Sequence, residues 1–591
     1  RIPANTAQGP YYQNMISSIQ KSGSGIQPPT PKEIYGVYLD EEVAELKDWI
    51  KSSKRQWDEY GVTLMCDSWT GITRMSIINF LVYCNRRVVF HKSINASDKI
   101  QDANYIESLM DTIVEEIGSQ YVVQIVTDNG ANFKKAGLQL MEKRNTLFWT
   151  PCAAHCIDLI LKDIGELDAV KNCVARAQSI TKFIYNHHWV HALMQKYING
   201  EILRPGVTRF ATNYIALKSL QQKRHGLKVM VTSQEWCDSR YSRLSDGKKI
   251  EKSILSSRFW DTTTEIIKGV EPLYVILRKV DMDKRPQMPY LKYMLIQARD
   301  EVRKAFKDDF KADQYIRIID RRTAVHMDQD IHNAAYYLNP AIQYRYALGT
   351  KHDLLTALRN VIYRLLPNTT DAADALIEGR LFRETIGSFS DVVAVSCRYT
   401  MDPGEEKLHI LIINYQLYLM LIICYANKFL FIFFAVEWWL QFGGDAPHLR
   451  KVAIRVLSQT TTSSGCERNW STFALIHTKI RNKLSYRRLE KLVYVHYNMR
   501  LKLRCAELDK EPEEPDIDPI DLQFYNEDSE PMLDWVEAAE NQEDPLLDEA
   551  GDPQRPSRFI SEAIEEEEAQ HQQVISPPRS QHGRSSSSQI A

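Results

Sequence analysis

The sequence predicts an α/β part, a large all-helical part and a disordered acidic C-terminal tail. Short apolar runs rich in β-branched and aromatic residues lie between residues 62 and 149, and such runs are typical of strands. Residues 167–399 show almost continuous helical spacing of apolar positions, which favours an all-helical region without chemistry of its own. The tail holds 24 acidic and three basic residues from Glu507 to Glu568. So much charge with so few apolar residues cannot bury a core.

The elements can be placed in order along the chain. Residues 1–30 are rich in Gly, Pro and Ser and predict an irregular lead-in. Within 31–166 the apolar patterns predict five strands, over 62–66, 77–84, 87–91, 121–127 and 147–149. They predict helices over 40–57, 102–117, 131–143 and 154–164, so that helices precede, separate and follow the strands. This order predicts a mixed sheet with helices on its faces. An all-helical stretch should follow over 167–403, then a helical block over 436–504 interrupted near 460–465, and the tail over 505–591.

One apolar segment, 404–435, fits none of its surroundings. Its length alone would span a membrane, but Asn414, Gln416, Asn427 and Lys428 interrupt it and nothing else in the sequence supports a membrane protein. A buried core helix is a second interpretation. A third is a retained intron, because Ile, Leu, Phe, Tyr, Asn and Lys are the residues that translated AT-rich DNA yields. We favour the intron and expect this segment to stay outside the compact fold.

Charge is distributed unevenly. Residues 1–506 carry a net charge of +17, whereas Glu507–Glu568 carry −21. A basic body fits a polyanion such as DNA, although a soluble enzyme with a solvating tail explains the pattern equally well. Ten cysteines without a Cys-x-x-Cys pair, and no signal peptide, indicate a reducing compartment, the cytosol or the nucleus.

Two aspartates follow strand-like runs. Asp67 comes after Val62–Cys66, and Asp128 comes after Tyr121–Thr127. Carboxylates at adjacent strand ends can share hard divalent cations such as Mg²⁺ or Mn²⁺. A pair of such ions supports phosphodiester chemistry. Each motif alone is weak, because Asp followed by Asn-Gly also makes an ordinary turn.

A third block of residues, together with the two aspartate motifs, resembles a known family. Ser-Gly-Cys-Glu-Arg-Asn-Trp-Ser over 464–471, followed by Lys-Ile-Arg-Asn-Lys-Leu over 479–484, resembles the C-terminal block of hobo/Activator (hAT) transposases. Asp67-Ser-Trp-Thr, Thr127-Asp128-Asn-Gly-Ala-Asn and Cys152-Ala-Ala-His155 resemble earlier blocks of that family, in the same order. The resemblance covers nearly all of 11–504 apart from the odd segment.

The resemblance implies a fold and a site. It implies an RNase H-like mixed sheet split by a large all-helical insertion. It also implies a DDE triad of Asp67, Asp128 and Glu467 that binds Mg²⁺ or Mn²⁺, and a last acid on a helix packed against the sheet. The C-terminal region, 436–504, would mediate dimerisation.

Other residues have weaker assignments. Cys152 and His155 resemble a pair near the active centre of the family, but half a zinc site and a buried core pair are alternatives. Arg209 and Phe210 stand in a block where many relatives have Arg-Trp, so Phe210 would stack on a DNA base less effectively. Basic residues of the C-terminal block could contact phosphates or form a solvated helix face, namely Arg468, Lys479, Arg481, Lys483, Arg487, Arg488 and Lys491.

Two functions therefore remain. The first is a nuclear, metal-dependent DNA transposase that cleaves DNA and transfers strands, supported by the intact triad. The second is an inactive or domesticated hAT descendant, a nuclear dimerising DNA-associated protein, supported by Phe210 and the odd segment. Many relatives also carry a BED-type zinc finger upstream, and no such Cys/His spacing precedes Asp67.

Overall fold

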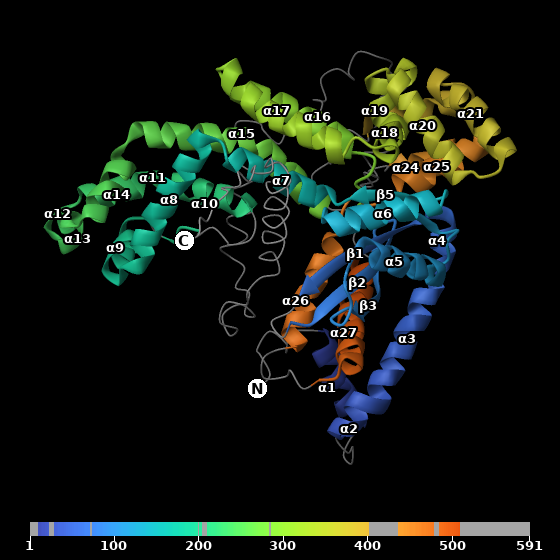
Figure 1. The fold of residues 1–591 in the computed structure, drawn as a ribbon, viewed down its shortest axis with the longest axis horizontal. Helices are drawn as coiled ribbons and strands as arrows, with labels where there is room; N and C mark the ends of the chain where they lie inside the picture. Colours follow the sequence, from blue (N-terminus) through green and yellow to red (C-terminus); the bar gives the residue numbers. More distant parts are fainter. Residues whose placement is uncertain are drawn as a thin grey trace, which may run out of the picture.

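The structure is a computed structural model of the 591-residue chain. It describes residues 10–22, 29–70, 74–198, 200–203, 210–282, 285–400, 435–477 and 484–508. A five-stranded mixed sheet is surrounded by helices, and a long helical region extends away from it (Figure 1). This arrangement confirms the predicted combination of an α/β part and a helical part.

The sheet has the strand order β3-β2-β1-β4-β5. Its strands are β1 (Val62–Thr70), β2 (Ser76–Cys84), β3 (Arg87–Asn95), β4 (Val122–Thr127) and β5 (Phe148–Pro151). The first three pair antiparallel, whereas β1–β4 and β4–β5 pair parallel. Helices cover both faces, so the central strands are buried on both sides and read as nearly continuous apolar runs.

Helices from the first part of the chain flank this sheet. They are α1 (Pro10–Ser22), α2 (Pro31–Glu33), the π-helix η2 (Ile34–Tyr38), α3 (Leu39–Ser52), α4 (Lys54–Tyr60), α5 (Ala103–Ile117), α6 (Ala131–Lys143) and α7 (Ala153–Gly165). Local signals set the bounds of α5. The carboxylate of Asp102 accepts from the backbone N–H of Tyr105 at 2.8 Å, which caps the helix start. Gly118 ends it with a φ of 110°, a value that suits glycine.

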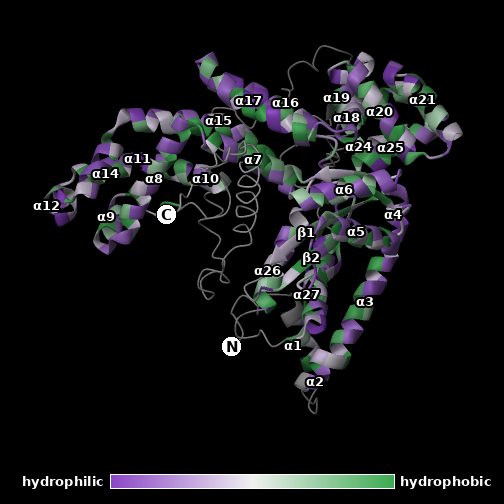
Figure 2. Ribbon diagram, in the orientation of Figure 1, coloured by the Kyte–Doolittle hydropathy of each residue, from purple (hydrophilic) through white to green (hydrophobic). Residues whose placement is uncertain are grey.

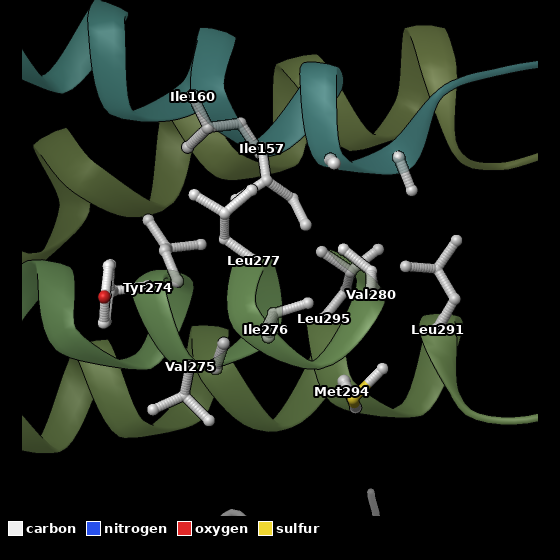
Figure 3. Packing of buried hydrophobic residues seen from close by; sticks show 14 of the residues in the cluster. Ile157, Ile160, Tyr274, Val275, Ile276, Leu277, Val280, Leu291, Met294 and Leu295 are labelled. Carbon is white, nitrogen blue, oxygen red and sulfur yellow. The ribbon is translucent and has the colours of Figure 1, made fainter. Parts of the chain in front are cut away.

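The region between α7 and residue 400 is helical wherever it is described. Its elements are α8 (Asp168–Asn186), α9 (His188–Ile198), α10 (Phe210–Gln222), α11 (Arg224–Thr232), α12 (Gln234–Asp238), α13 (Arg240–Arg243), α14 (Ser245–Leu255), α15 (Ser257–Asp281), α16 (Leu291–Ala305), α17 (Asp309–His326), α18 (Asp330–Leu338), α19 (Pro340–Arg345), η3 (Leu348–Thr350), α20 (His352–Leu365), α21 (Thr369–Glu384), η4 (Gly387–Ser390) and α22 (Val392–Thr400). Figure 3 shows how α15 joins its neighbours. Ile157 and Ile160 of α7 face Leu277 and Val280 of α15, and Met294 of α16 lies on the other side. This apolar packing ties the helical region to the helix that follows β5.

The chain then returns to the sheet. Its last helices are α24 (Ala435–Phe442), α25 (Pro447–Leu457), α26 (Ser464–Ile476) and α27 (Tyr486–Leu508). The link between α25 and α26 is buried and bonded to distant segments. Gln459 Oε1 accepts from Thr63 Oγ1 at 2.8 Å, and the backbone N–H of Ala153 donates to Thr461 O at 2.9 Å. These bonds fix where α26 starts relative to β1.

The C-terminal helices cover one face of the sheet. Helix α26 contacts β1 and β2, and α27 contacts β3 and α3. Helices α5 and α6 pack against each other beside the sheet (Figure 1). Figure 2 shows hydrophilic and hydrophobic residues alternating along surface helices such as α3, as expected of helices that turn one side toward a core.

Several expectations need correction. Residues 10–22 of the predicted irregular lead-in form α1, which starts at Pro10, a residue well suited to a first helical turn. Strand β1 continues to Thr70 through its pairing with β2, so Asp67 lies inside the strand and not at its end. Helix α27 continues past residue 504 to Leu508, because Cys505 is still buried.

Two other predictions concern residues that lie largely outside the described ranges. Within the 404–435 segment only Ala435 is described; it begins α24 and is buried. The tail lies outside the described residues from residue 509 onward. Within the described part of the chain, no helix is long and apolar enough to cross a membrane.

Candidate functional site

The register of the sheet brings Asp67 and Asp128 together. The parallel pairing of β1 with β4 ends at Cys66 and Thr127. Asp67 and Asp128 each follow these last paired residues. Because the two strands run in the same direction, the two aspartates stand at the same level, just past the last β1–β4 pair.

Asp67 is held by an aromatic neighbour from the far end of the chain. Asp67 is 7% exposed, and its Oδ2 accepts from Trp470 Nε1 of α26 at 2.7 Å. Trp470 also stacks on Trp69, with ring centroids 5.5 Å apart and planes at 22°. The indole is thus fixed by stacking on β1 while its N–H orients the Asp67 carboxyl group.

Asp128 belongs to the turn between β4 and α6. Its Oδ1 accepts from the backbone N–H of Gly130 at 3.1 Å. The strand before it is anchored by Trp149 of β5, whose Nε1 donates to Thr127 Oγ1 at 3.0 Å. His155 of α7 lies close enough for its charge to act on the Asp128 carboxyl group. Part of Asp128 reaches the surface, although protein atoms surround its carboxyl group densely.

Glu467 comes to the same place on the first turn of α26. The helix starts very close to the sheet, since a side-chain carbon at Gly465 would lie 3.3 Å from Met65 and 3.4 Å from Leu81. Glu467 is half-buried, and its charge acts on both Asp67 and Asp128. Three acidic residues predicted from separate motifs therefore interact electrostatically.

Burial and mutual repulsion shift the titration of the two aspartates. Burial raises the pKa of Asp67 well above its usual range, and repulsion from Asp128 and Glu467 raises it further, against the Trp470 bond. The pKa of Asp128 is also raised, first by burial. The nearby His155 and the Gly130 N–H oppose this rise, while Glu467 adds to it. Each aspartate thus ionises at a cost that a nearby cation would offset.

Three buried thiols surround the acids. Burial raises the pKa of Cys152 to about 11, and it raises those of Cys66 and Cys466 well above the usual thiol range. The charges of the acids add to each shift. In the metal-free protein these thiols are therefore protonated at neutral pH.

The donor chemistry of the site fits a hard divalent cation. With the thiols protonated, the anionic donors are carboxylate oxygens, which Mg²⁺ and Mn²⁺ prefer. Among the described residues, however, no group of three or more His, Cys, Asp or Glu side chains is close enough to hold one ion. The three carboxylates would have to draw together around it. Within the described part of the chain, Cys152 and His155 therefore lack the further ligands that a zinc site would need.

Cys152 and His155 lie beside the acids. Cys152 Sγ accepts from the backbone N–H of Ser463 at 3.4 Å, just before α26, and interacts with the charge of Glu467. His155 stands one helical turn further on, beside Asp128. Cys152 is buried and His155 is half-buried, and their nearest acids are Glu467 and Asp128 respectively.

The predicted DNA-contact residues are only partly described. Arg209, Lys479, Arg481 and Lys483 lie outside the described residues, and Phe210 is the first residue of α10. Arg468 is held by protein groups, because its Nη1 donates to Asp281 O at 2.9 Å and to Ser464 Oγ at 3.4 Å. Of the remaining basic cluster, Lys491 pairs with Asp40, and Arg488 lies 5.8 Å from the ring centre of Tyr35.

Sequence reasoning assigned no role to the two tryptophans that orient Asp67. Trp69 and Trp470 both stand inside the motifs that carry the acids, in Asp-Ser-Trp-Thr and Asn-Trp-Ser. Their distances from the acids, two and three residues, were the available signal. That the two rings stack on each other depends on the packing of α26, which the sequence does not display.

Comparisons with known proteins give two matches. Residues 29–180, which include Asp67, Asp128, Cys152 and His155, match the family described as a domain of unknown function, DUF659. Residues 420–499, which include Glu467 and most of α27, match the hAT family C-terminal dimerisation region. The second match begins inside the odd 404–435 segment. No curated protein matches the chain.

Proposed function

Since this chain is a hAT-family transposase-like protein, we propose that it is a DNA transposase that cleaves and joins DNA at the ends of a mobile element. The observation that carries the proposal is that three acidic residues from distant parts of the chain lie near enough for their charges to act on one another. Asp67 comes from β1, Asp128 from the end of β4 and Glu467 from α26, and the charge of Glu467 acts on both aspartates.

The topology supports an RNase H-like core for this activity. Asp67 within β1 and Asp128 just after β4 stand at one level on adjacent parallel strands, and the third acid is on a helix that packs on the sheet. All helices from α8 to α22 lie in the sequence between the second and third acids. This is the arrangement expected of an RNase H-like fold split by a helical insertion.

Four residues of the site have roles in the proposed reaction. Asp67, Asp128 and Glu467 would hold Mg²⁺ or Mn²⁺, which when bound activates the attacking oxygen and stabilises the leaving one. Trp470 orients the Asp67 carboxylate through its N–H. The net positive charge of residues 1–506 would attract DNA, which also fits a nuclear location.

The match to a dimerisation region supports self-association. Of the apolar residues near the C-terminus, Leu489 and Val493 are already buried in the core of this chain. Leu475 of α26 is 41% exposed and remains available for another molecule. Light scattering on a protein ending at Leu508 should give at least a dimer. Replacing Leu475 with Asp should weaken the dimer, and a monomeric parent protein would contradict self-association.

The catalytic proposal is tested by removing each charge while keeping the side-chain shape. Asp67→Asn, Asp128→Asn and Glu467→Gln should each abolish Mn²⁺-dependent cleavage of DNA carrying the element's ends. Their melting temperatures should stay equal or rise, because each change removes a repulsion. Glu142, an exposed acid on α6, provides the control, and Glu142→Gln should keep full activity. Cleavage that survives any of the three changes would reject the proposed site.

A second function rests on the C-terminal match, which does not depend on the acids. A descendant without cleavage activity would keep the dimerising region and the basic body. Such a protein would self-associate and bind DNA but show no cleavage with Mn²⁺. The same cleavage assay on the unmodified protein therefore separates the two functions.

A further inference from the structure

A row of polar side chains crosses the sheet at Asp67. In the register of the sheet, Ser93 of β3 lies opposite Asn79 of β2, and Asn79 lies opposite Asp67 of β1. Residues directly opposite each other on paired strands point to the same side of a sheet. Asp128 continues the row, because it follows β4 at the level of Asp67. The row thus leads from β3 to the carboxylate site.

The row faces α26 and α27. Trp470 of α26 donates to Asp67, and Ser93 Oγ lies 2.9 Å from the hydroxyl of Tyr486, the first residue of α27. Gly465 of α26 approaches Leu81, which is two residues along β2 from Asn79 and therefore on the same face. Asn79 lies in the middle of this row, beneath the two helices.

Asn79 is fully buried, and neither end of its amide has a hydrogen-bond partner. Among the described residues, the only other amide side chain with both ends buried and unpartnered is Asn469, which adjoins Trp470 in α26. An unsatisfied buried amide lowers stability and is rare in folded proteins. Both unpartnered amides lie near the carboxylates, which points to a functional role for Asn79 at this site.

A nearby asparagine shows the contrasting, structural arrangement. Asn498 of α27 is equally buried, but its Nδ2 donates to Phe90 O at 2.9 Å and its Oδ1 accepts from Phe90 N at 2.8 Å. Both ends of this amide are satisfied by the backbone of β3. Asn79 stands one strand further toward the site and has no such bonds.

Building on the proposed function, we propose that Asn79 is a positioning residue for Asp67. When the site holds a divalent cation, the Asn79 amide nitrogen donates to the Asp67 carboxylate from the β2 side, while Trp470 Nε1 donates from the α26 side. Hydrogen bonds to an ionised acceptor are the strong ones. Two donors on either side would keep the carboxylate directed toward Asp128. Groups that orient metal ligands in this way commonly change metal affinity when they are replaced.

The test compares two substitutions of nearly equal size in the full chain. Asn79→Leu removes an unpartnered amide, so the melting temperature without metal should stay equal or rise. Its affinity for Mn²⁺, measured from the rise in melting temperature over a Mn²⁺ titration, should fall by roughly 10- to 100-fold. The control Asn498→Leu unpairs the backbone of Phe90, so its melting temperature should fall while its affinity for Mn²⁺ stays unchanged. Asn79→Ala, with a smaller side chain, separates loss of the amide from steric effects of Leu.

The outcomes separate this inference from the proposed function. If both Asn79 variants bind Mn²⁺ as tightly as the unmodified protein, Asn79 does not position Asp67, and the triad proposal is unaffected. A loss of stability in both variants without a loss of Mn²⁺ affinity would likewise assign Asn79 a structural role. If the unmodified protein binds no Mn²⁺, the metal-dependent function fails, and this inference fails with it.

Discussion

At the scale of single residues, the site depends on side chains that are buried beside one another. Asp67 is the clearest case, because burial and two neighbouring acids oppose its ionisation while one indole N–H favours it. Trp470 therefore links the stability of the fold to the state of the carboxylate. The hydrogen bond of Trp470 can be tested separately from its packing, because another aromatic ring at this position would keep the stacking on Trp69.

Replacing Trp470 with Phe keeps an aromatic ring but removes the N–H that Asp67 accepts from. The free energy of unfolding should fall by about 1–3 kcal/mol, the usual cost of losing such a bond, and Mn²⁺ binding should weaken. Trp438→Phe is a matched control, because Trp438 Nε1 donates to Ala394 O at 3.0 Å away from the site. The control should lose similar stability by urea denaturation without any change in Mn²⁺ binding. Equal Mn²⁺ affinity in both variants would contradict the role of Trp470.

A buried histidine makes stability depend on pH. Burial lowers the pKa of His332 in α18 to about 4, although its Nδ1–H donates to Met327 O at 2.9 Å. The unfolded chain takes up this proton near pH 6.5. Stability from the neutral form is therefore complete above pH 6.5 and is lost as pH falls toward 4. Between pH 7 and 5 the loss due to His332 should be about 2 kcal/mol.

The measurement is the free energy of unfolding at both pH values. In His332→Gln, the difference between pH 7 and pH 5 should be smaller than in the unmodified protein by that amount, whatever the change in overall stability. An unchanged difference would show that His332 is not kept neutral by burial.

At the scale of elements, close approaches between helices and strands hold the acids in place. Gly137 of α6 is the tightest of them at the site, because a side-chain carbon there would lie 2.0 Å from Cδ1 of Trp149 in β5. Trp149 in turn donates to Thr127, the residue before Asp128. The packing of α6 on β5 therefore affects the position of Asp128 through the ring of Trp149.

Gly137→Ala should destabilise the protein by about 1–3 kcal/mol through overpacking, although alanine is the better helix former. It should also weaken Mn²⁺ binding by displacing Trp149. Gly379 in α21 is the matched control, since nothing lies within 4 Å of an added carbon there. Gly379→Ala should stabilise the protein by up to about 1 kcal/mol. Thermal and urea unfolding compare the two, and a neutral Gly137→Ala would mean that α6 can shift without cost.

At the scale of the whole molecule, opposite charges occupy different parts of the chain. Residues 1–506 carry +17 and Glu507–Glu568 carry −21. An acidic segment on the same chain competes with DNA for basic surface, and the competition weakens as salt screens it. A protein ending at Leu508 should therefore bind DNA more tightly than the full chain at low ionic strength. Fluorescence anisotropy with labelled DNA measures the difference, which should shrink at high salt; equal affinities at low salt would reject the competition.

Much of the architecture follows from local patterns in the sequence. Strand-like runs predicted five strands near their observed places, because a strand buried on both faces needs apolar residues at nearly every position. The predicted bounds of the helix over 131–143 agree with those of α6, since helical periodicity is a local property. The motifs around Asp67, Asp128 and Glu467 also predicted the three acids of the proposed site. Their identity is a matter of residue type and order along the chain.

Tertiary structure decided how those residues act. Buried bonds between distant segments, those of Gln459 and Thr461 among them, bring the start of α26 over β1, and thereby Glu467 and Trp470 to Asp67. The unpartnered amide of Asn79 appears only once β2 is paired and covered. Burial, and with it the raised pKa of Asp67, is a property of many residues together. The sequence by itself determined which chemical groups the site has; long-range packing determined their distances and charges, because both depend on contacts between segments that lie hundreds of residues apart.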